Sequence, residues 1–101
     1  MTGKIYSVEE IKKIVSPIAA SHGVEKLYLF GSYARGDADA ASDMDFRLDN
    51  GQIKGLFALG SLYAELEDAL GKKIDLLTSD SLDDEFRRRI SSEEVLLYAH
   101  E

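Results

Sequence analysis

The stretch LYLFGSYARGDADAASDMDFRL, residues 27–48, decides the fold that we expect for this chain. It begins with a short apolar run, Leu27–Phe30, whose residue types favour a β-strand. Gly31 and Ser32 interrupt this run, and residues 43–48 then alternate polar and apolar side chains, which is typical of a second strand. The stretch therefore predicts two strands joined by a short polar crossover that contains one helical turn.

Gly31 and Ser32 stand at the end of the first expected strand. Because glycine has no Cβ atom, the backbone there can approach a ligand closely. Serine is a favourable residue at the start of a helical turn, whose backbone N–H groups can bind an anion. We interpret the pair as a phosphate-binding turn, and an ordinary strand-exit turn is the alternative.

Asp43 and Asp45 are two residues apart, so their side chains are predicted to project from one face of the sheet. Met44, Phe46 and Leu48 project from the other face, where they can pack against helices. Two neighbouring carboxylates repel each other unless a cation lies between them, and such oxygen ligands suit Mg²⁺. A Mg²⁺ site beside a phosphate site serves phosphoryl or nucleotidyl transfer. Solvated carboxylates at the sheet edge are the alternative.

A third carboxylate, Asp75, lies in the short strand-like run of residues 73–77. It stands between two apolar neighbours, so it is predicted to face away from the helices, as Asp43 and Asp45 do. Taken alone, Asp75 would be interpreted as a structural residue. Together with the other two aspartates it predicts a three-carboxylate site.

The spacing of these residues resembles a known signature. Gly31-Ser32, ten intervening residues and then Asp43-x-Asp45 are similar to the signature of the polymerase β-type nucleotidyltransferases. The longer strings, GSYARG at residues 31–36 and SDMD at residues 42–45, resemble the minimal nucleotidyltransferases (MNT proteins) of bacteria and archaea. Asp75 matches the third carboxylate of the family pattern. The resemblance covers roughly residues 8–98.

The resemblance implies an α/β (α+β) fold, with a small mixed sheet and helices packed on one face, in a single domain over residues 1–101. It implies an enzyme that transfers an NMP, AMP from ATP in the first instance, to an acceptor hydroxyl. The implied nucleotide-binding residues are Gly31, Ser32 and Arg35. The implied catalytic residues, which would also hold two Mg²⁺ ions, are Asp43, Asp45 and Asp75.

The family also implies a protein partner. Such small proteins often pair with a HEPN-domain toxin, as the antitoxin of a type VII-like toxin–antitoxin system, and some adenylylate a tyrosine on it. A binding module that neutralises its partner by contact, with little turnover, is the alternative. A small-molecule transferase of the aminoglycoside-modifying type is a weaker hypothesis, since the short chain leaves no residues for a drug pocket. Homo- and hetero-oligomers both stay open.

Two arginines near the aspartates have more than one interpretation. Arg35 is expected to pair with neighbouring acidic residues or face a partner, with phosphate contact as the alternative. Arg47 departs from the family pattern, in which an aliphatic residue commonly stands two positions after the second aspartate. On the acidic face, Arg47 would neutralise that face, contact the nucleotide or a partner, or weaken metal binding and so reduce catalysis.

The composition limits the partners and the location of the chain. With 19 acidic and 12 basic residues among 101, the formal net charge is −7, which disfavours nucleic acid as the main partner. An acidic surface favours a basic protein partner, although a role in solubility explains the charge more simply. Cysteine is absent, so disulfides and thiolate metal sites are excluded. Without a membrane-spanning run or a signal-peptide core, we expect a cytoplasmic protein.

Three helices are expected outside the motif. Apolar residues recur at helical spacing between the capping box Ser7–Glu10 and Gly23 and over residues 53–70. Residues 83–90 begin with acidic residues and end near arginines, which matches the dipole of a third helix. The second segment carries a stripe that we expect in the core: Leu56, Leu59, Leu62, Tyr63, Leu66 and Leu70. Two glycines weaken its first half. The apolar run at residues 95–98 is expected to form an edge strand or a helix.

Overall fold

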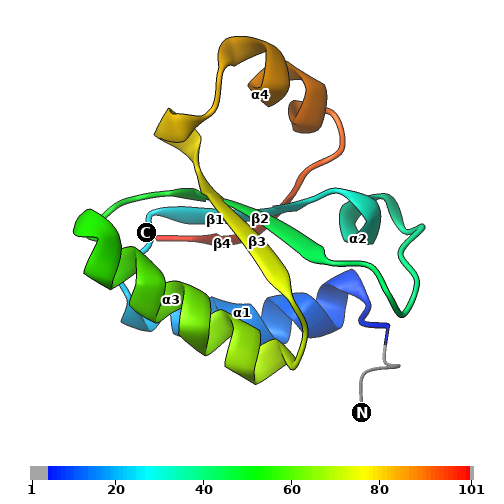
Figure 1. Cartoon of the computed structure of the whole chain (residues 1–101), viewed down its shortest axis with the longest axis horizontal. Helices are drawn as coiled ribbons and strands as arrows, with labels where there is room; N and C mark the ends of the chain where they lie inside the picture. The colour runs from blue at the N-terminus through cyan, green and yellow to red at the C-terminus, as the bar shows by residue number, and fades with distance from the viewer. Residues whose placement is uncertain (1–4, 101) are drawn as a thin grey trace.

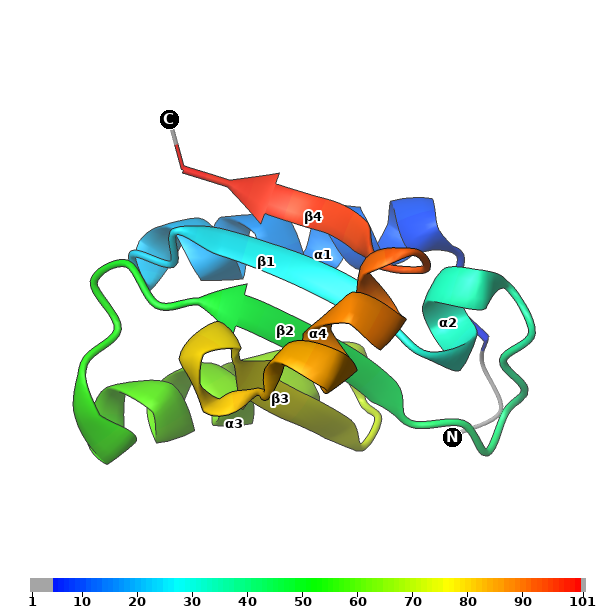
Figure 2. The same ribbon diagram turned by 90° about the horizontal axis from the view of Figure 1, so that it is seen from above.

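The computed structural model describes residues 5–100, which form a mixed sheet with helices on both faces (Figure 1). Helices α1 (Val8–Ser21) and α3 (Gly55–Leu70) cover one face, and α4 (Asp84–Ser91) lies over the other (Figures 1 and 2). The strands are β1 (Lys26–Phe30), β2 (Met44–Asp49), β3 (Ile74–Thr78) and β4 (Val95–Ala99). Two short elements complete the fold, α2 (Ser32–Arg35) and the 3₁₀ turn η1 (Ser79–Ser81).

The strand order is β3-β2-β1-β4. Strand β1 pairs antiparallel with both β2 and β4, whereas β2 and β3 are parallel and are joined through α3, as parallel neighbours require. The register places Asp45 of β2 beside Phe30 of β1 on one side and beside Asp75 of β3 on the other. The exit of β1 and the aspartates of β2 and β3 therefore meet at one end of the sheet.

The core lies between the sheet and the two long helices. Met44, Phe46 and Leu48 of β2 are fully buried there, as the alternation in the sequence predicted, together with Leu27 and Leu29 of β1. Full burial of one such side chain contributes about 1.5–3 kcal/mol. This packing fixes the other side of β2 toward α4, so the polar residues of the strand share that face.

Helix α1 begins and ends where its sequence signals predicted. The Ser7 hydroxyl accepts a hydrogen bond from the Glu10 N–H at 3.1 Å, and the Glu10 carboxylate accepts one from the Ser7 N–H at 2.9 Å. Gly23 follows the helix with a φ of +73°. The buried stripe of the helix consists of Ile11, Val15, Ile18 and Ala19.

Helix α3 confirms most of the leucine stripe and corrects its first member. Leu62, Leu66 and Leu70 are buried, but Leu56 is 85% exposed, so its prediction as a core residue was wrong. Leu56 and its neighbour Phe57, which is 98% exposed, lie in the first turn of α3, whereas the buried residues of the helix begin at Leu62. Leu56 fits the helical period of the stripe, so its exposure depends on which part of the helix meets the core.

Strand β4 and helix α4 decide two points about the fold that the sequence left open. Residues 95–99 form the edge strand β4 rather than a helix. The expectation of helices on one face holds for α1 and α3, whereas α4 packs over the opposite face. There the rings of Phe86 and Phe30 meet edge to face, with their centres 6.0 Å apart.

Among residues 5–100, no helix combines the length and apolar character needed to cross a bilayer.

Candidate active site

Asp45 and Asp75 lie side by side on adjacent parallel strands. Because they are register partners, their side chains project from the same face of the sheet, the face opposite to the core. Asp43 precedes β2 by one residue and belongs to the same alternating set as Asp45. The structure therefore brings together the three aspartates that the sequence singled out, with Asp75 on the predicted side.

The carboxyl groups of this site interact with one another. The pKa of Asp45 is raised from 3.8 to about 6, first by burial, then by a hydrogen bond with Asp75 and by the negative charges of Asp75 and Asp43. The positive charge of Arg35 opposes this shift. The aspartates thus carry more negative charge than their surroundings compensate, which is the condition that a bound cation relieves.

The donors at this site are compatible with Mg²⁺, although they do not form a preassembled cage. Among residues 5–100, no group of three His, Cys, Asp or Glu side chains is arranged to hold a metal ion. Mg²⁺ commonly uses only one or two carboxylates and takes its other ligands from water and phosphate. The adjacent pair Asp45 and Asp75, with Asp43 nearby, fits that requirement.

Gly31 connects the strand exit to the carboxylates. Its φ is +79°, a left-handed conformation that favours glycine, and a Cβ atom added there would overlap the carboxylate of Asp45. A side chain at position 31 would therefore disturb both the turn and the acid pair. Both the backbone conformation of this turn and the closeness of the Asp45 carboxylate therefore require glycine at position 31.

The turn after Gly31 has the predicted form. Ser32 begins α2, a single helical turn in which the Arg35 N–H donates to the Gly31 carbonyl at 3.0 Å. Gly36 ends the turn with a φ of +87°. Ser32 and Arg35 therefore lie at opposite ends of one turn, next to the edge of the carboxylate site.

Arg35 pairs with acidic side chains, the first of its two predicted roles. Its guanidinium contacts Asp37 at 3.3 Å and Glu93 at 3.2 Å, and these contacts raise its pKa, the one with Asp37 most strongly. Glu93 also accepts a hydrogen bond of 2.9 Å from the Gly31 N–H. No local pattern in the sequence pointed to Glu93, because 62 positions separate it from Gly31.

Arg47 has a structural role that the sequence did not resolve. It is only 8% exposed, its guanidinium binds both oxygens of Glu94 at 2.7 and 3.0 Å, and it donates to Ser79 at 2.6 Å. The guanidinium also lies 4.0 Å from the centre of the Tyr28 ring. Arg47 thus neutralises Glu94 and connects β2 to η1 and to the segment before β4, which agrees with the first of its interpretations, neutralisation of the acidic face.

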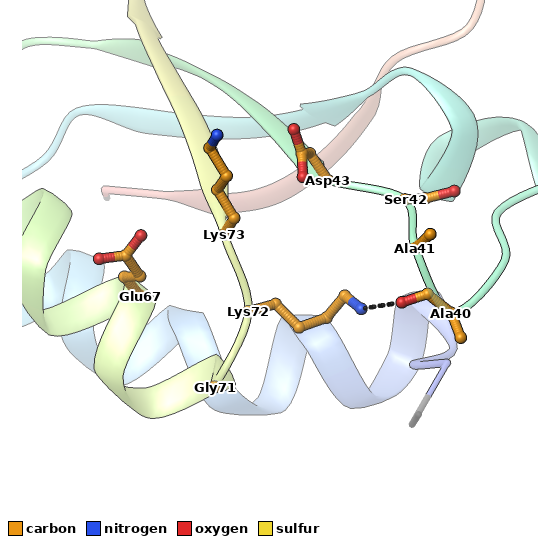
Figure 3. Close-up of a pocket in the computed structure, with 8 residues that line it drawn as sticks. All are labelled: Ala40, Ala41, Ser42, Asp43, Glu67, Gly71, Lys72 and Lys73. Atoms are coloured by element: carbon orange, nitrogen blue, oxygen red, sulfur yellow. Dashed lines mark hydrogen bonds between the residues drawn. The ribbon is translucent and has the colours of Figure 1, made fainter. Parts of the chain in front are cut away.

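A cavity of about 500 Å³ opens beside Asp43 (Figure 3). It lies between residues 40–43 of the crossover and residues 71–73 before β3, where Lys72 donates to the Ala40 carbonyl at 3.1 Å. Figure 3 shows Lys73 and Asp43 extending the same way at one side of this cavity. Lys73 was not among the site residues predicted from the sequence. Its position two residues before Asp75 places it on the same face of the sheet as Asp75.

The comparison with known families covers nearly the whole chain. Residues 9–101 match the family model described as polymerase beta, nucleotidyltransferase. MJ0435, a candidate protein adenylyltransferase of Methanocaldococcus jannaschii, is 40% identical over 89 residues, which are 88% of this chain and 96% of the relative. The protein adenylyltransferase MntA of Thermococcus cleftensis is 35% identical over 80 residues, which are 75% of this chain and 81% of MntA.

Solved structures share the fold. A candidate minimal nucleotidyltransferase superposes with a TM-score of 0.78 at 27% identity, over 92% of this chain and 98% of its own. A chain from the complex of a tri-AMPylated Shewanella oneidensis HEPN toxin with an MNT antitoxin superposes with a TM-score of 0.70 at 18% identity, over 92% of this chain and 73% of its own. The chain therefore belongs to the polymerase β nucleotidyltransferase family, among the homologues of its minimal, protein adenylyltransferase-like members.

Proposed function

We propose that this protein transfers AMP from ATP to a hydroxyl group of a HEPN-domain toxin and thereby acts as the antitoxin of a type VII-like toxin–antitoxin pair. The observation that carries this proposal is the Asp45–Asp75 pair next to Gly31. The relatives named as protein adenylyltransferases and the MNT antitoxin with the same fold support the choice of a protein acceptor.

In this proposal each residue of the site has an assigned role. Gly31 and Ser32 bind the terminal phosphates of ATP, so the α-phosphate lies over the aspartates. Asp43, Asp45 and Asp75 hold Mg²⁺, which would neutralise phosphate charge and polarise the α-phosphate. The acceptor oxygen bonds to the α-phosphorus while the bond from that phosphorus to the bridging oxygen breaks and pyrophosphate leaves. Asp75 accepts the proton of the acceptor hydroxyl.

The position of the cavity supports this direction of transfer. In an in-line displacement, the attacking and leaving oxygens lie on opposite sides of the phosphorus. With pyrophosphate leaving on the side of Gly31, the acceptor enters from the side of β3. The cavity beside Asp43 and Lys73 opens on that side, and the ammonium group of Lys73 would stabilise the acceptor oxygen as it loses its proton.

A labelled-nucleotide experiment tests the proposed reaction. The protein is incubated with Mg²⁺, ATP labelled at the α- or the γ-phosphate, and a purified HEPN-domain toxin. We expect label on the partner from α-labelled ATP only, and at least about a hundredfold less transfer with Asp43→Ala or Asp45→Ala. Absence of transfer by the wild-type protein, or equal transfer by the variants, would contradict the proposal.

A contact-only antitoxin is the second hypothesis, and one contact favours it. The Gly31 N–H, which the proposed reaction assigns to phosphate, already donates to Glu93. The two hypotheses predict different results for toxin inhibition by the Asp43→Ala, Asp45→Ala double variant. Inhibition that survives this change, without any transferred label, supports neutralisation by contact.

A further inference from the structure

The Glu93 carboxylate occupies hydrogen-bond donors that face the carboxylate site. One of its oxygens accepts from the Gly31 N–H at 2.9 Å and from the Arg35 guanidinium at 3.2 Å, and its other oxygen lies 3.4 Å from the same guanidinium nitrogen. A backbone N–H and a guanidinium together form a donor set for an anion. In this conformation the anion is a side chain of the protein itself.

The position of Glu93 in the fold brings it to these donors. It lies in the connection between α4 and β4, which passes beside α2 in Figure 2. The next residue, Glu94, is fixed through both of its oxygens to Arg47. Because Glu94 holds the backbone of the connection, the Glu93 side chain can leave the donors by rotation while the connection stays in place.

The two glutamates differ in what surrounds them. The side chain of Glu93 is 26% exposed and its partner Arg35 is 47% exposed, whereas the side chains of Glu94 and Arg47 are 12% and 10% exposed. Ion pairs that solvent reaches contribute little stability, about 0–1 kcal/mol. A polyphosphate carries several negative charges, so it competes well for donors that a single carboxylate holds weakly.

We propose that Glu93 is a built-in competitor for the phosphate-binding donors, so that only a polyphosphate ligand displaces it. This inference rests on the proposed function, since it assigns the terminal phosphates of the nucleotide to Gly31 and Arg35. A triphosphate reaches these donors while its α-phosphate lies over the aspartates. A monophosphate bound at the aspartates does not reach them, so Glu93 stays in place. Glu93 thereby weakens the binding of ATP and leaves that of the monophosphate unchanged, so it reduces the preference of the site for ATP.

Removal of the negative charge of Glu93 tests this competition. Isothermal titration calorimetry measures the dissociation constants of AMP-PNP, inorganic tripolyphosphate and AMP, each with Mg²⁺, for the wild type and for Glu93→Gln. Glutamine keeps an oxygen that accepts from the Gly31 N–H but carries no charge. We expect AMP-PNP and tripolyphosphate to bind about three- to fivefold more tightly to Glu93→Gln, and AMP to change by less than about twofold.

Asp37→Asn is the matched control, because Asp37 also pairs with Arg35 but has no contact with the Gly31 N–H among the interactions of residues 5–100. We expect it to tighten polyphosphate binding less than Glu93→Gln does, because it frees Arg35 but not the Gly31 N–H. A second readout is the NMR signal of the Glu93 carboxyl carbon, which should shift when AMP-PNP saturates the wild-type protein and stay in place with AMP.

The outcomes separate this inference from the proposed function. Unchanged or weaker polyphosphate binding by Glu93→Gln, or equal tightening by Asp37→Asn, would overturn the competition but leave AMP transfer intact. Failure of every polyphosphate to bind either protein would overturn both. Tighter binding by Glu93→Gln without transfer to any partner would support the competition and refute the proposed reaction.

Discussion

At the scale of single residues, the contact between Gly31 and Asp45 joins the two halves of the sequence motif. The left-handed conformation at Gly31 lets the chain leave β1, and the missing Cβ leaves room for the Asp45 carboxylate. The glycine therefore meets two requirements, one of the backbone and one of the neighbouring strand. Gly36, five residues later, has only the first requirement, because a Cβ atom there would meet nothing within 4 Å.

This difference predicts the effects of two alanine substitutions. Gly36→Ala should lower the free energy of unfolding by about 1–2 kcal/mol, which is the penalty for a left-handed alanine. Gly31→Ala should lower it by about 2–4 kcal/mol, since the backbone there (φ +79°, ψ −156°) is a conformation that glycine almost alone adopts, and overlap with Asp45 adds to that strain. Urea denaturation of both variants measures the two losses. Equal losses would show that the overlap with Asp45 adds nothing to the destabilisation.

At the scale of elements, the Arg47–Glu94 ion pair holds α4 and its connection against the sheet. Arg47 stands on β2, and Glu94 immediately precedes β4, an edge strand that pairs with β1 alone in the described sheet. The hydrogen bond from Arg47 to Ser79 also fixes the turn after β3. The pair thus orders the segment that carries Glu93 and brings it to the start of α2.

Substitutions of Arg47 and Glu94 separate the contribution of their charge interaction to stability from that of side-chain packing. Arg47→Met should lower the free energy of unfolding by about 3–5 kcal/mol, because Glu94 then stays buried without its cation. The double variant Arg47→Met, Glu94→Leu should recover most of that loss, since it leaves no buried charge unpaired. Chemical denaturation measures both values. A single variant as stable as the wild type would mean that solvent already screens the pair.

At the scale of the whole molecule, the site holds repelling carboxylates in a protein of net charge −7. The raised pKa of Asp45 shows that the fold opposes ionisation of this group. A cation or a positively charged partner residue reduces such repulsion. Binding at the site is therefore expected to stabilise the folded protein, as any ligand specific to the native state does.

The pH dependence of stability follows from this pKa. The folded pKa of Asp45, about 6, exceeds its ordinary value of 3.8, so the folded state binds the proton more tightly than the unfolded state does. Its contribution is greatest below about pH 4 and is lost as the pH rises through 6. In EDTA, the free energy of unfolding should therefore fall by at most about 3 kcal/mol from this source between pH 4 and 7.

The variant Asp45→Asn isolates this contribution. It should show a flatter pH profile than the wild type between pH 4 and 7, and it should be the more stable protein at pH 7 without Mg²⁺. Urea denaturation at several pH values gives both profiles. Parallel profiles for the two proteins would mean that Asp45 ionises in the fold as freely as in water.

The sequence by itself determined the local parts of this protein. Alternating side chains predicted that Asp43 and Asp45 share a face and that Asp75 joins them, and the strand partners of Asp45 confirm that placement. The Gly-Ser turn and the capping box of α1 were predictable for the same reason. Each depends on residues within a few positions of one another, where backbone geometry leaves few conformations.

Only the tertiary structure decided what lies against these parts. Glu93 reaches Gly31 across 62 positions, and Glu94 reaches Arg47 across 47, so neither pairing follows from any local pattern. The side of the sheet that α4 covers was likewise set by packing, through Phe86 on Phe30. Contacts between distant segments depend on how the whole chain closes around its core, and the composition of each segment alone does not specify them.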